Sequence, residues 1–212
     1  MRNRQTIGLF VFLVFLVPGL AYAIVNLYEK KEKLPVFGPG QLVGRNRTEH
    51  IISDFELVNQ DGNKKNFYDW KGQIIIANFF FSHCPVVCPK MTGNLQKLNN
   101  QFQQNKDIHI ISISVDPERD SSAQLKNYAH RFSIDTQKWD LLTGNKQEIY
   151  RLARNSFMVV ATDGDGGPND FIHSDKVVLI DRLGRIRGFY DGTDESAINS
   201  LSHDIKKLQD EE

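Results

Sequence analysis

The sequence lacks an excess of charge of either sign. Lysine and arginine together number 26, aspartate and glutamate also number 26, and the formal net charge is zero. A protein that binds nucleic acid normally presents a strongly basic face, because contacts to phosphate dominate its affinity. The balance of charge therefore argues against DNA or RNA as a partner.

Cysteine is scarce as well, and the two residues of this type, Cys84 and Cys88, lie close together. A small secreted fold that depends on disulfides needs more cysteines, spread more widely along the chain. The pair is therefore predicted to serve a local purpose.

One long apolar run occurs near the N-terminus, where residues 7–25 carry no charge. About 20 such residues cross a bilayer as a helix, and the preceding Arg2 and Arg4 favour a cytoplasmic N-terminus. We therefore expect a membrane anchor over residues 1–28 and a domain on the extracytoplasmic (periplasmic) side. A cleaved signal peptide is the alternative, because Ala21-Tyr22-Ala23 fits the pattern of a cleavage site.

The rest of the chain divides into a linker and one domain. Residues 29–50 combine a charged patch with repeated Gly and Pro, which predicts extended chain, and residues 51–212 are expected to fold. Within them, Asp61-Gly62 predicts a hairpin turn, and residues 74–81 form a β-branched and aromatic run typical of a strand buried on both faces. Apolar spacing then predicts helices at 91–102, 116–132, 149–153 and 198–208, and strands at 108–115, 177–180 and 186–190.

This order of elements predicts an α/β domain with a central mixed sheet flanked by helices, behind one N-terminal membrane helix. A strand, a cysteine turn and a helix follow one another at the first βα unit. That succession is the arrangement of the thioredoxin-like fold.

Cys84 and Cys88 form a CxxxC pair at this strand-to-helix turn. The N-terminus of a helix stabilises negative charge, so at least one thiol is expected to have a lowered pKa. A thiolate is both a nucleophile and a soft metal ligand. Two other interpretations are weaker: a disulfide over so few residues would constrain the unfolded chain little, and the flanking Pro85 and Pro89 argue against two unpaired core cysteines.

A third metal ligand would have to come from one of six histidines. His173 is distinguished by its place directly before the strand predicted at 176–181, since in thioredoxin-like domains the loop entering that strand lies against the cysteine turn. Spacing does not prove contact, so the residues alone leave His173 a candidate. The other histidines are predicted to lie in structural or solvated positions: His50, His83, His109, His130 and His203.

Several stretches together resemble the Sco/SenC family of copper-handling proteins. They are Phe81-Ser82-His83-Cys84-Pro85-Val86-Val87-Cys88-Pro89, Ile111-Ser112-Ile113-Ser114-Val115-Asp116-Pro117-Glu118-Arg119-Asp120, residues 139–144, His173-Ser174 and Leu179-Ile180-Asp181. They occur in the family's order over roughly residues 51–207, and the cysteine stretch combined with Val-Asp-Pro-Glu-Arg-Asp is specific.

The resemblance implies a thioredoxin fold and a site for Cu(I) or Cu(II) formed by Cys84, Cys88 and His173. It also implies delivery of copper, or of reducing equivalents, to the binuclear copper centre of subunit two of cytochrome c oxidase. An upstream copper donor or thiol reductant would be a further partner.

Two departures from the family accompany this resemblance. Val86 stands between the cysteines where the family commonly has aspartate, which is expected to alter metal affinity or docking without removing a ligand. Residues 162–170 form a longer, glycine-rich stretch shortly before His173, which we interpret as a flexible turn that could gate the site. This stretch lacks the spacing and terminal Glu of an EF-hand.

Three functions compete for these residues. The first is a copper metallochaperone, a transfer protein and not a turnover enzyme. The second is a thiol–disulfide oxidoreductase that uses Cys84 and Cys88 as a redox-active pair and does not need His173. The third, a peroxidase of the peroxiredoxin type, lacks its expected Thr before the nucleophile. The acidic stretch at residues 116–120 is interpreted as the start of a helix, with acids that complement its dipole, in preference to a docking surface.

Overall fold

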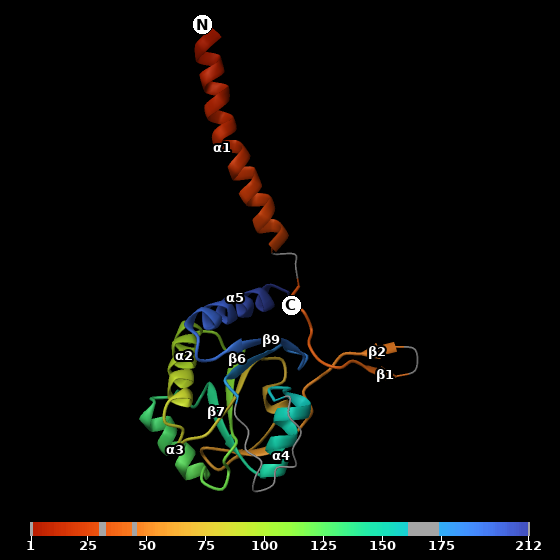
Figure 1. The fold of residues 1–212 in the computed structure, drawn as a ribbon, viewed down its shortest axis with the longest axis vertical. Helices are drawn as coiled ribbons and strands as arrows, with labels where there is room; N and C mark the ends of the chain where they lie inside the picture. Colours follow the sequence, from red (N-terminus) through yellow and green to blue (C-terminus); the bar gives the residue numbers. More distant parts are fainter. Residues whose placement is uncertain (1, 30–32, 44–45, 161–173, 212) are drawn as a thin grey trace. The chain divides into compact units, whose positions relative to one another are not determined.

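The computed structural model describes residues 2–29, 33–43, 46–160 and 174–211 (Figure 1). The chain divides into two compact units, Met1–Leu34 with Lys206–Glu212 and Pro35–Ile205. In the first unit, helix α1 spans Arg2–Glu29 and contains Pro18. The membrane helix expected there is not shown: among the described residues, no helix is both long enough and apolar enough to cross a membrane.

Seven strands among the described residues of the second unit form one mixed sheet. They are β3 (Glu56–Asn59), β4 (Lys64–Asn66), β5 (Ile74–Phe80), β6 (Ile108–Ser114), β7 (Trp139–Thr143), β8 (Lys176–Ile180) and β9 (Ile186–Asp191). Their spatial order is β4-β3-β7-β6-β5-β8-β9. β5, β6 and β7 are parallel, and antiparallel hairpins extend the sheet on both sides. The predicted central mixed sheet is confirmed.

β5 and β6 lie in the middle of this sheet, and every residue of both strands is buried. The Ile- and Phe-rich sequence of β5 suits burial on both faces, as expected for a parallel strand between helices. The two strands pair from Ile74 with Ile108 to Phe80 with Ser114. They therefore end together, and the segments that follow them lie side by side.

Helices cover both faces of the sheet (Figure 1). They are α2 (Val87–Gln101), α3 (Ser122–Arg131), α4 (Lys146–Arg151) and α5 (Glu195–Glu211), with a 3-10 turn η1 (Phe67–Trp70) and a π-helical turn η2 (Leu152–Ser156). Successive side chains of a strand point to opposite faces of the sheet, so neighbouring residues of β5 contact different helical segments. Phe80 contacts Tyr128 of α3, with ring centroids 5.1 Å apart, and Phe79 contacts Phe157 after η2 at 5.4 Å.

Three elements differ from the sequence-based expectation. β7 was not predicted, because its apolar sequence is short and interrupted by Asp140. α3 begins at Ser122 with Ser121 as its N-cap, so the acidic stretch 116–120 precedes the helix and does not start it. The predicted extended linker contains a two-stranded hairpin, β1 (Gln41–Val43) and β2 (Asn46–Thr48).

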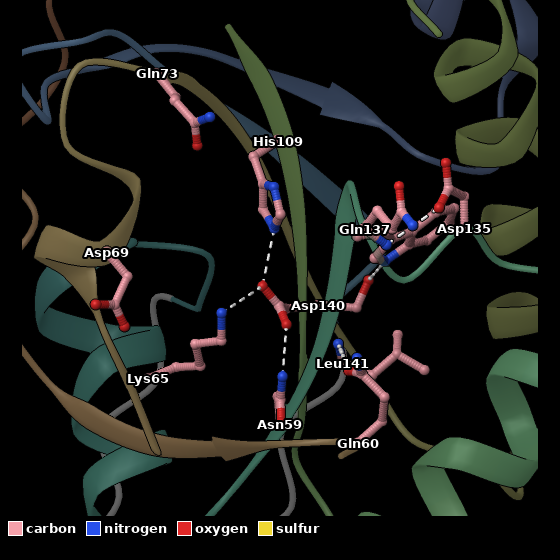
Figure 2. Close-up of polar contacts among 12 residues, drawn as sticks. Asn59, Gln60, Lys65, Asp69, Gln73, His109, Asp135, Gln137, Asp140 and Leu141 are labelled. Carbon is pink, nitrogen blue, oxygen red and sulfur yellow. Dashed lines mark hydrogen bonds and ion pairs between the residues drawn. The ribbon is translucent and has the colours of Figure 1, made fainter. Parts of the chain in front are cut away.

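A buried polar cluster centred on Asp140 lies near the amino ends of β6 and β7 (Figure 2). Its carboxylate accepts hydrogen bonds from Asn59 Nδ2 at 2.9 Å, and its other oxygen lies 2.9 Å from His109 Nε2 and 3.6 Å from Lys65 Nζ. The His109 ring also packs on Trp70, with centroids 5.6 Å apart. The prediction that His109 is structural is thus confirmed.

Candidate metal centre

The cysteine turn follows the carboxyl end of β5. The amide of Val115 donates to the Phe80 carbonyl at 2.8 Å, and the amide of Cys84 then donates to the Phe81 carbonyl at 3.2 Å. The structure brings the two cysteines together, because the Cys88 amide donates to Cys84 Sγ at 3.3 Å. Both thiols are free.

The sulfur of Cys84 acts as the cap of α2. The N-cap residue is Val86, whose aliphatic side chain cannot accept a hydrogen bond. Pro89, at the third helical position, has no N–H group to offer. The Cys88 amide is instead donated to the Cys84 sulfur, which occupies the role that a Ser, Thr or Asp side chain usually has at a helix start.

This arrangement separates the two thiols in acidity. Burial opposes ionisation of Cys84, but hydrogen bonds from the backbone amides of Cys88, Val86 and Val87 outweigh it and lower the pKa of the thiol. Burial, together with hydrogen bonding to the Cys84 sulfur, raises the pKa of Cys88 to about 12. Cys84 is therefore the more acidic thiol, and Cys88 must release its proton to a base or to solvent if it is to ionise.

The surface around Cys84 is apolar and accessible. Cys84 is half-buried, Cys88 is buried, and the intervening Val86 is 68% exposed. A cavity of about 500 Å³ lies against both cysteines. Its described lining also includes Phe79, Phe80, Phe81, Pro85, Val87, Val115, Val159, Ser174, Asp175 and Lys176.

His173, the predicted third ligand, lies outside the described residues, as does the glycine-rich stretch 162–170. Ser174 and Asp175, which follow His173 in the sequence, line the cavity beside the cysteines. Within the described parts of the chain, no three or more His, Cys, Asp or Glu side chains gather in a group that could hold a metal.

Asp120 is a residue of this region that sequence reasoning missed. It was interpreted as part of a helix start, but its side chain is fully buried and accepts hydrogen bonds from the amide and hydroxyl of Ser82, two residues before Cys84. A signal was present in the sequence. Asp120 follows β6 as Ser82 follows β5, and neighbouring parallel strands bring such segments together.

The donor set suits copper chemically. Thiolate sulfur is a soft ligand that favours Cu(I), and an imidazole nitrogen suits Cu(II) as well. The lowered pKa of Cys84 favours one such thiolate, and the hydrogen bond from the Cys88 amide to the Cys84 sulfur brings the second cysteine beside it.

A family model described as SCO1/SenC matches residues 43–210, which is most of the chain. The chain belongs to the SCO1/SenC family. The resemblance seen in the cysteine and Val-Asp-Pro-Glu-Arg-Asp stretches is thus confirmed.

Individual SCO1/SenC relatives agree with this assignment. The SCO1 protein homolog of Bacillus subtilis (strain 168) is 32% identical over 157 residues, which cover 73% of this chain and 81% of that protein. The structure of BsSco, a Sco-family cytochrome c oxidase assembly protein in which a disulfide switch was identified, is 31% identical. Its TM-score is 0.65, with 75% of this chain and 93% of that chain covered. Arabidopsis thaliana ScoI, solved with copper bound, is 28% identical with a TM-score of 0.62, over 76% and 99% of the two chains. The mixed α/β fold of the SCO1/SenC chain matches these structures.

Proposed function

We propose that this protein binds copper through Cys84, Cys88 and His173 and passes it on during assembly of cytochrome c oxidase. The recipient we propose is the binuclear copper centre of subunit two, and an upstream copper donor or thiol reductant would supply the site. The observation that carries the proposal is the pairing of two free thiols at the start of α2, one of them with a lowered pKa.

The comparisons support the copper part of this proposal. Arabidopsis thaliana ScoI was solved with copper bound, and BsSco belongs to a family of cytochrome c oxidase assembly proteins. Two sulfurs and one imidazole would leave a coordination position open, which a carrier needs in order to hand its metal to a partner. The exposed apolar surface around Val86 would give that partner direct access to Cys84.

We also propose that residues 1–28 anchor the protein and place its domain on the extracytoplasmic side of the membrane. The uncharged run over residues 7–25 and the preceding Arg2 and Arg4 support this topology. A signal peptide cleaved after Ala23 would export the same domain without the anchor.

The second candidate function is thiol–disulfide exchange with the cysteines of a partner. It is favoured by the unequal acidity of the two thiols, since a low-pKa attacking cysteine beside a buried, protonated one is an arrangement suited to exchange. This function needs the cysteines and does not need His173.

Copper titration of the reduced full-length chain in detergent separates the two functions. The variants are His173→Ala and, as a matched control, His203→Ala, which removes an exposed histidine from α5. The proposal predicts one equivalent of Cu(II) with sulfur-to-copper charge-transfer absorption in the wild type and the control, and loss of that band in His173→Ala. Unchanged binding by His173→Ala would refute the ligand assignment. Absence of copper binding in the wild type, with reversible Cys84–Cys88 oxidation, would favour the exchange function.

A further inference from the structure

Asp120 connects the loop after β6 to the cysteine turn after β5. Its side chain is completely buried. One carboxylate oxygen accepts from the Ser82 amide at 2.9 Å and from the Ser114 hydroxyl at 2.5 Å, and the other accepts from the Ser82 hydroxyl at 2.5 Å. Each oxygen of the Asp120 side chain therefore has at least one hydrogen-bond donor, as a buried polar group requires if it is not to be destabilising.

Ser82 is held on all sides by these and neighbouring groups. Besides its two bonds to Asp120, its carbonyl accepts from Arg131 Nη2 and its hydroxyl from Gln124 Nε2, both at 3.2 Å. Arg131 and Gln124 come from α3. Every polar atom of Ser82 thus has a partner on the loop after β6 or on α3.

The hydrogen bonds between Asp120 and Ser82 lie just beyond the end of the β5–β6 pairing. The last pairing of β5 is at Phe80, and Val115 closes the ladder by donating to the Phe80 carbonyl. Cys84 comes four residues later, and α2 begins only at Val87. Up to Phe80, backbone hydrogen bonds to β6 hold the chain in place. At Ser82 the side chain of Asp120 supplies the hydrogen bonds instead.

We propose that Asp120 is a positioning residue for the cysteine pair: by fixing Ser82, it holds the turn so that Cys84 and Cys88 face one another for joint chemistry. This inference rests on the proposed function in taking the two sulfurs as the working groups. Asp120 acts through its hydrogen bonds to Ser82 and is not taken as a copper ligand.

Disulfide formation measures this positioning without any metal. The reduced protein reacts with glutathione disulfide: the Cys84–Cys88 bond forms, the glutathione disulfide bond breaks, and two molecules of reduced glutathione carry away the two thiol protons. The equilibrium constant is an effective concentration of one thiol beside the other. If the hydrogen bonds between Asp120 and Ser82 are lost, the turn holds the two sulfurs together less well, and the equilibrium constant for disulfide formation falls.

The measurement is this constant in a glutathione redox buffer, on the full-length chain in detergent, for Asp120→Ala, Asp120→Asn and Ser82→Ala. Asp120→Ala removes both hydrogen bonds to Ser82 and is expected to lower the equilibrium constant for disulfide formation about tenfold. Ser82→Ala keeps the hydrogen bond from the backbone amide of residue 82 to Asp120 and loses only the one from the hydroxyl, so a smaller fall of about threefold in the constant is expected. Asp140→Ala is the control for loss of a buried carboxylate far from the turn, and it leaves the constant unchanged.

Asp120→Asn tests the mechanism. Its amide oxygen can accept from the Ser82 amide and Ser114, and its NH₂ group can donate to the Ser82 hydroxyl, so the constant is expected to stay within about twofold of wild type. A fall as large as in Asp120→Ala would overturn positioning by hydrogen bonds, because loss of charge alone would then suffice.

Wild-type constants in both Asp120→Ala and Ser82→Ala would overturn the proposal outright. If Asp120→Ala does not fold, as judged by circular dichroism, Ser82→Ala and Asp120→Asn decide the question. Because no copper is present, failure here is distinguishable from failure of the copper proposal, which the titration of His173→Ala tests separately.

Discussion

Two aspartates are buried at opposite ends of the same parallel strands. Asp120 follows the carboxyl end of β6, and Asp140 lies near the amino end of β7 beside His109. His109 and Ser114, their respective contacts on β6, are separated by about 17 Å along the strand at roughly 3.3 Å per residue. Both carboxylates are almost inaccessible to solvent, at 0% and 3% exposure.

The two aspartates differ in what their partners are. Asp140 binds side chains of three other strands, Asn59 on β3, Lys65 on β4 and His109 on β6, and so ties the sheet together. Asp120 binds one strand residue and the backbone and side chain of Ser82 in a turn. Although both side chains are buried, Asp140 connects strands of the sheet, whereas Asp120 binds the turn that carries Cys84.

Removal of a ligand at the Asp120 end is expected to have the largest effect on copper. Cys84→Ala should weaken copper binding by at least about 1,000-fold, beyond the 10–100-fold typical when only an outer partner of a ligand is lost. Competition with a chelator of known affinity measures it. Asp140→Ala should bind copper as the wild type does, and a similar loss in both variants would abolish the distinction between the two ends.

The reverse experiment removes Asp140 and measures stability. Asp140→Ala leaves buried His109 and Asn59 without their acceptor, so the free energy of unfolding should fall by about 3 kcal/mol. Urea denaturation monitored by circular dichroism gives the value. Glu118→Ala, at an exposed position, is the control and should change stability by less than about 0.5 kcal/mol. A loss below about 1 kcal/mol for Asp140→Ala would show that the cluster does not hold the sheet.

The same cluster predicts how stability responds to acid. Burial opposes ionisation of Asp140, but hydrogen bonds from His109 and Asn59 lower the pKa of its carboxyl below the ordinary value. A group whose pKa is lowered by folding adds stability above its unfolded pKa, near 3.9, and loses it as pH falls through the folded pKa. Wild type should therefore lose stability below about pH 4 more steeply than Asp140→Asn. Parallel pH curves for the two would contradict this.

At the cysteine end, pH separates the two thiols. An ordinary cysteine thiol has a pKa of about 8.5. The pKa of Cys84 is lowered, so its thiolate forms at a lower pH, whereas the pKa of Cys88 is raised to about 12. Alkylation by iodoacetamide at pH 8, mapped by mass spectrometry, should modify Cys84 at least tenfold faster than Cys88. Equal rates would show that the hydrogen bonds to Cys84 do not control its acidity.

The smallest expected effect concerns Val86. Val86→Asp supplies a capping carboxylate that competes with Cys84 Sγ for the Cys88 amide. Stability should rise by about 1 kcal/mol, the usual value of an N-cap, while the pKa of Cys84 rises because a negative charge arrives and a donor leaves. Val86→Asn, a cap without charge, should raise the pKa less. An unchanged alkylation profile in both variants would contradict sulfur capping.

Much of this fold could be predicted from local patterns. The strand at residues 74–80, buried on both faces, was recognisable from its unbroken apolar sequence, and the hairpin at Asp61-Gly62 from its turn chemistry. β7 was missed because Trp139-Asp140-Leu141-Leu142-Thr143 is short, contains a buried acid and adjoins a helix. Its identity as a strand depends on pairing with β6 and β3, which lie far away in the sequence.

The candidate site was only partly predictable for the same reason. The CxxxC spacing and the helix start indicated Cys84 and Cys88, because both signals are local. The role of Asp120 is not marked by a local motif, and the only signal for it is that the segments after two neighbouring parallel strands lie side by side. His173 stays a prediction that rests on its place before β8 and on the family resemblance.

X-ray absorption spectroscopy of the copper-loaded full-length chain is the sharpest test of a copper site formed by Cys84, Cys88 and His173. Two sulfur ligands and one imidazole are expected in the wild type, with loss of the imidazole in His173→Ala and the wild-type ligands in Asp140→Ala. A copper shell without sulfur, or an imidazole that persists in His173→Ala, would contradict this set of ligands.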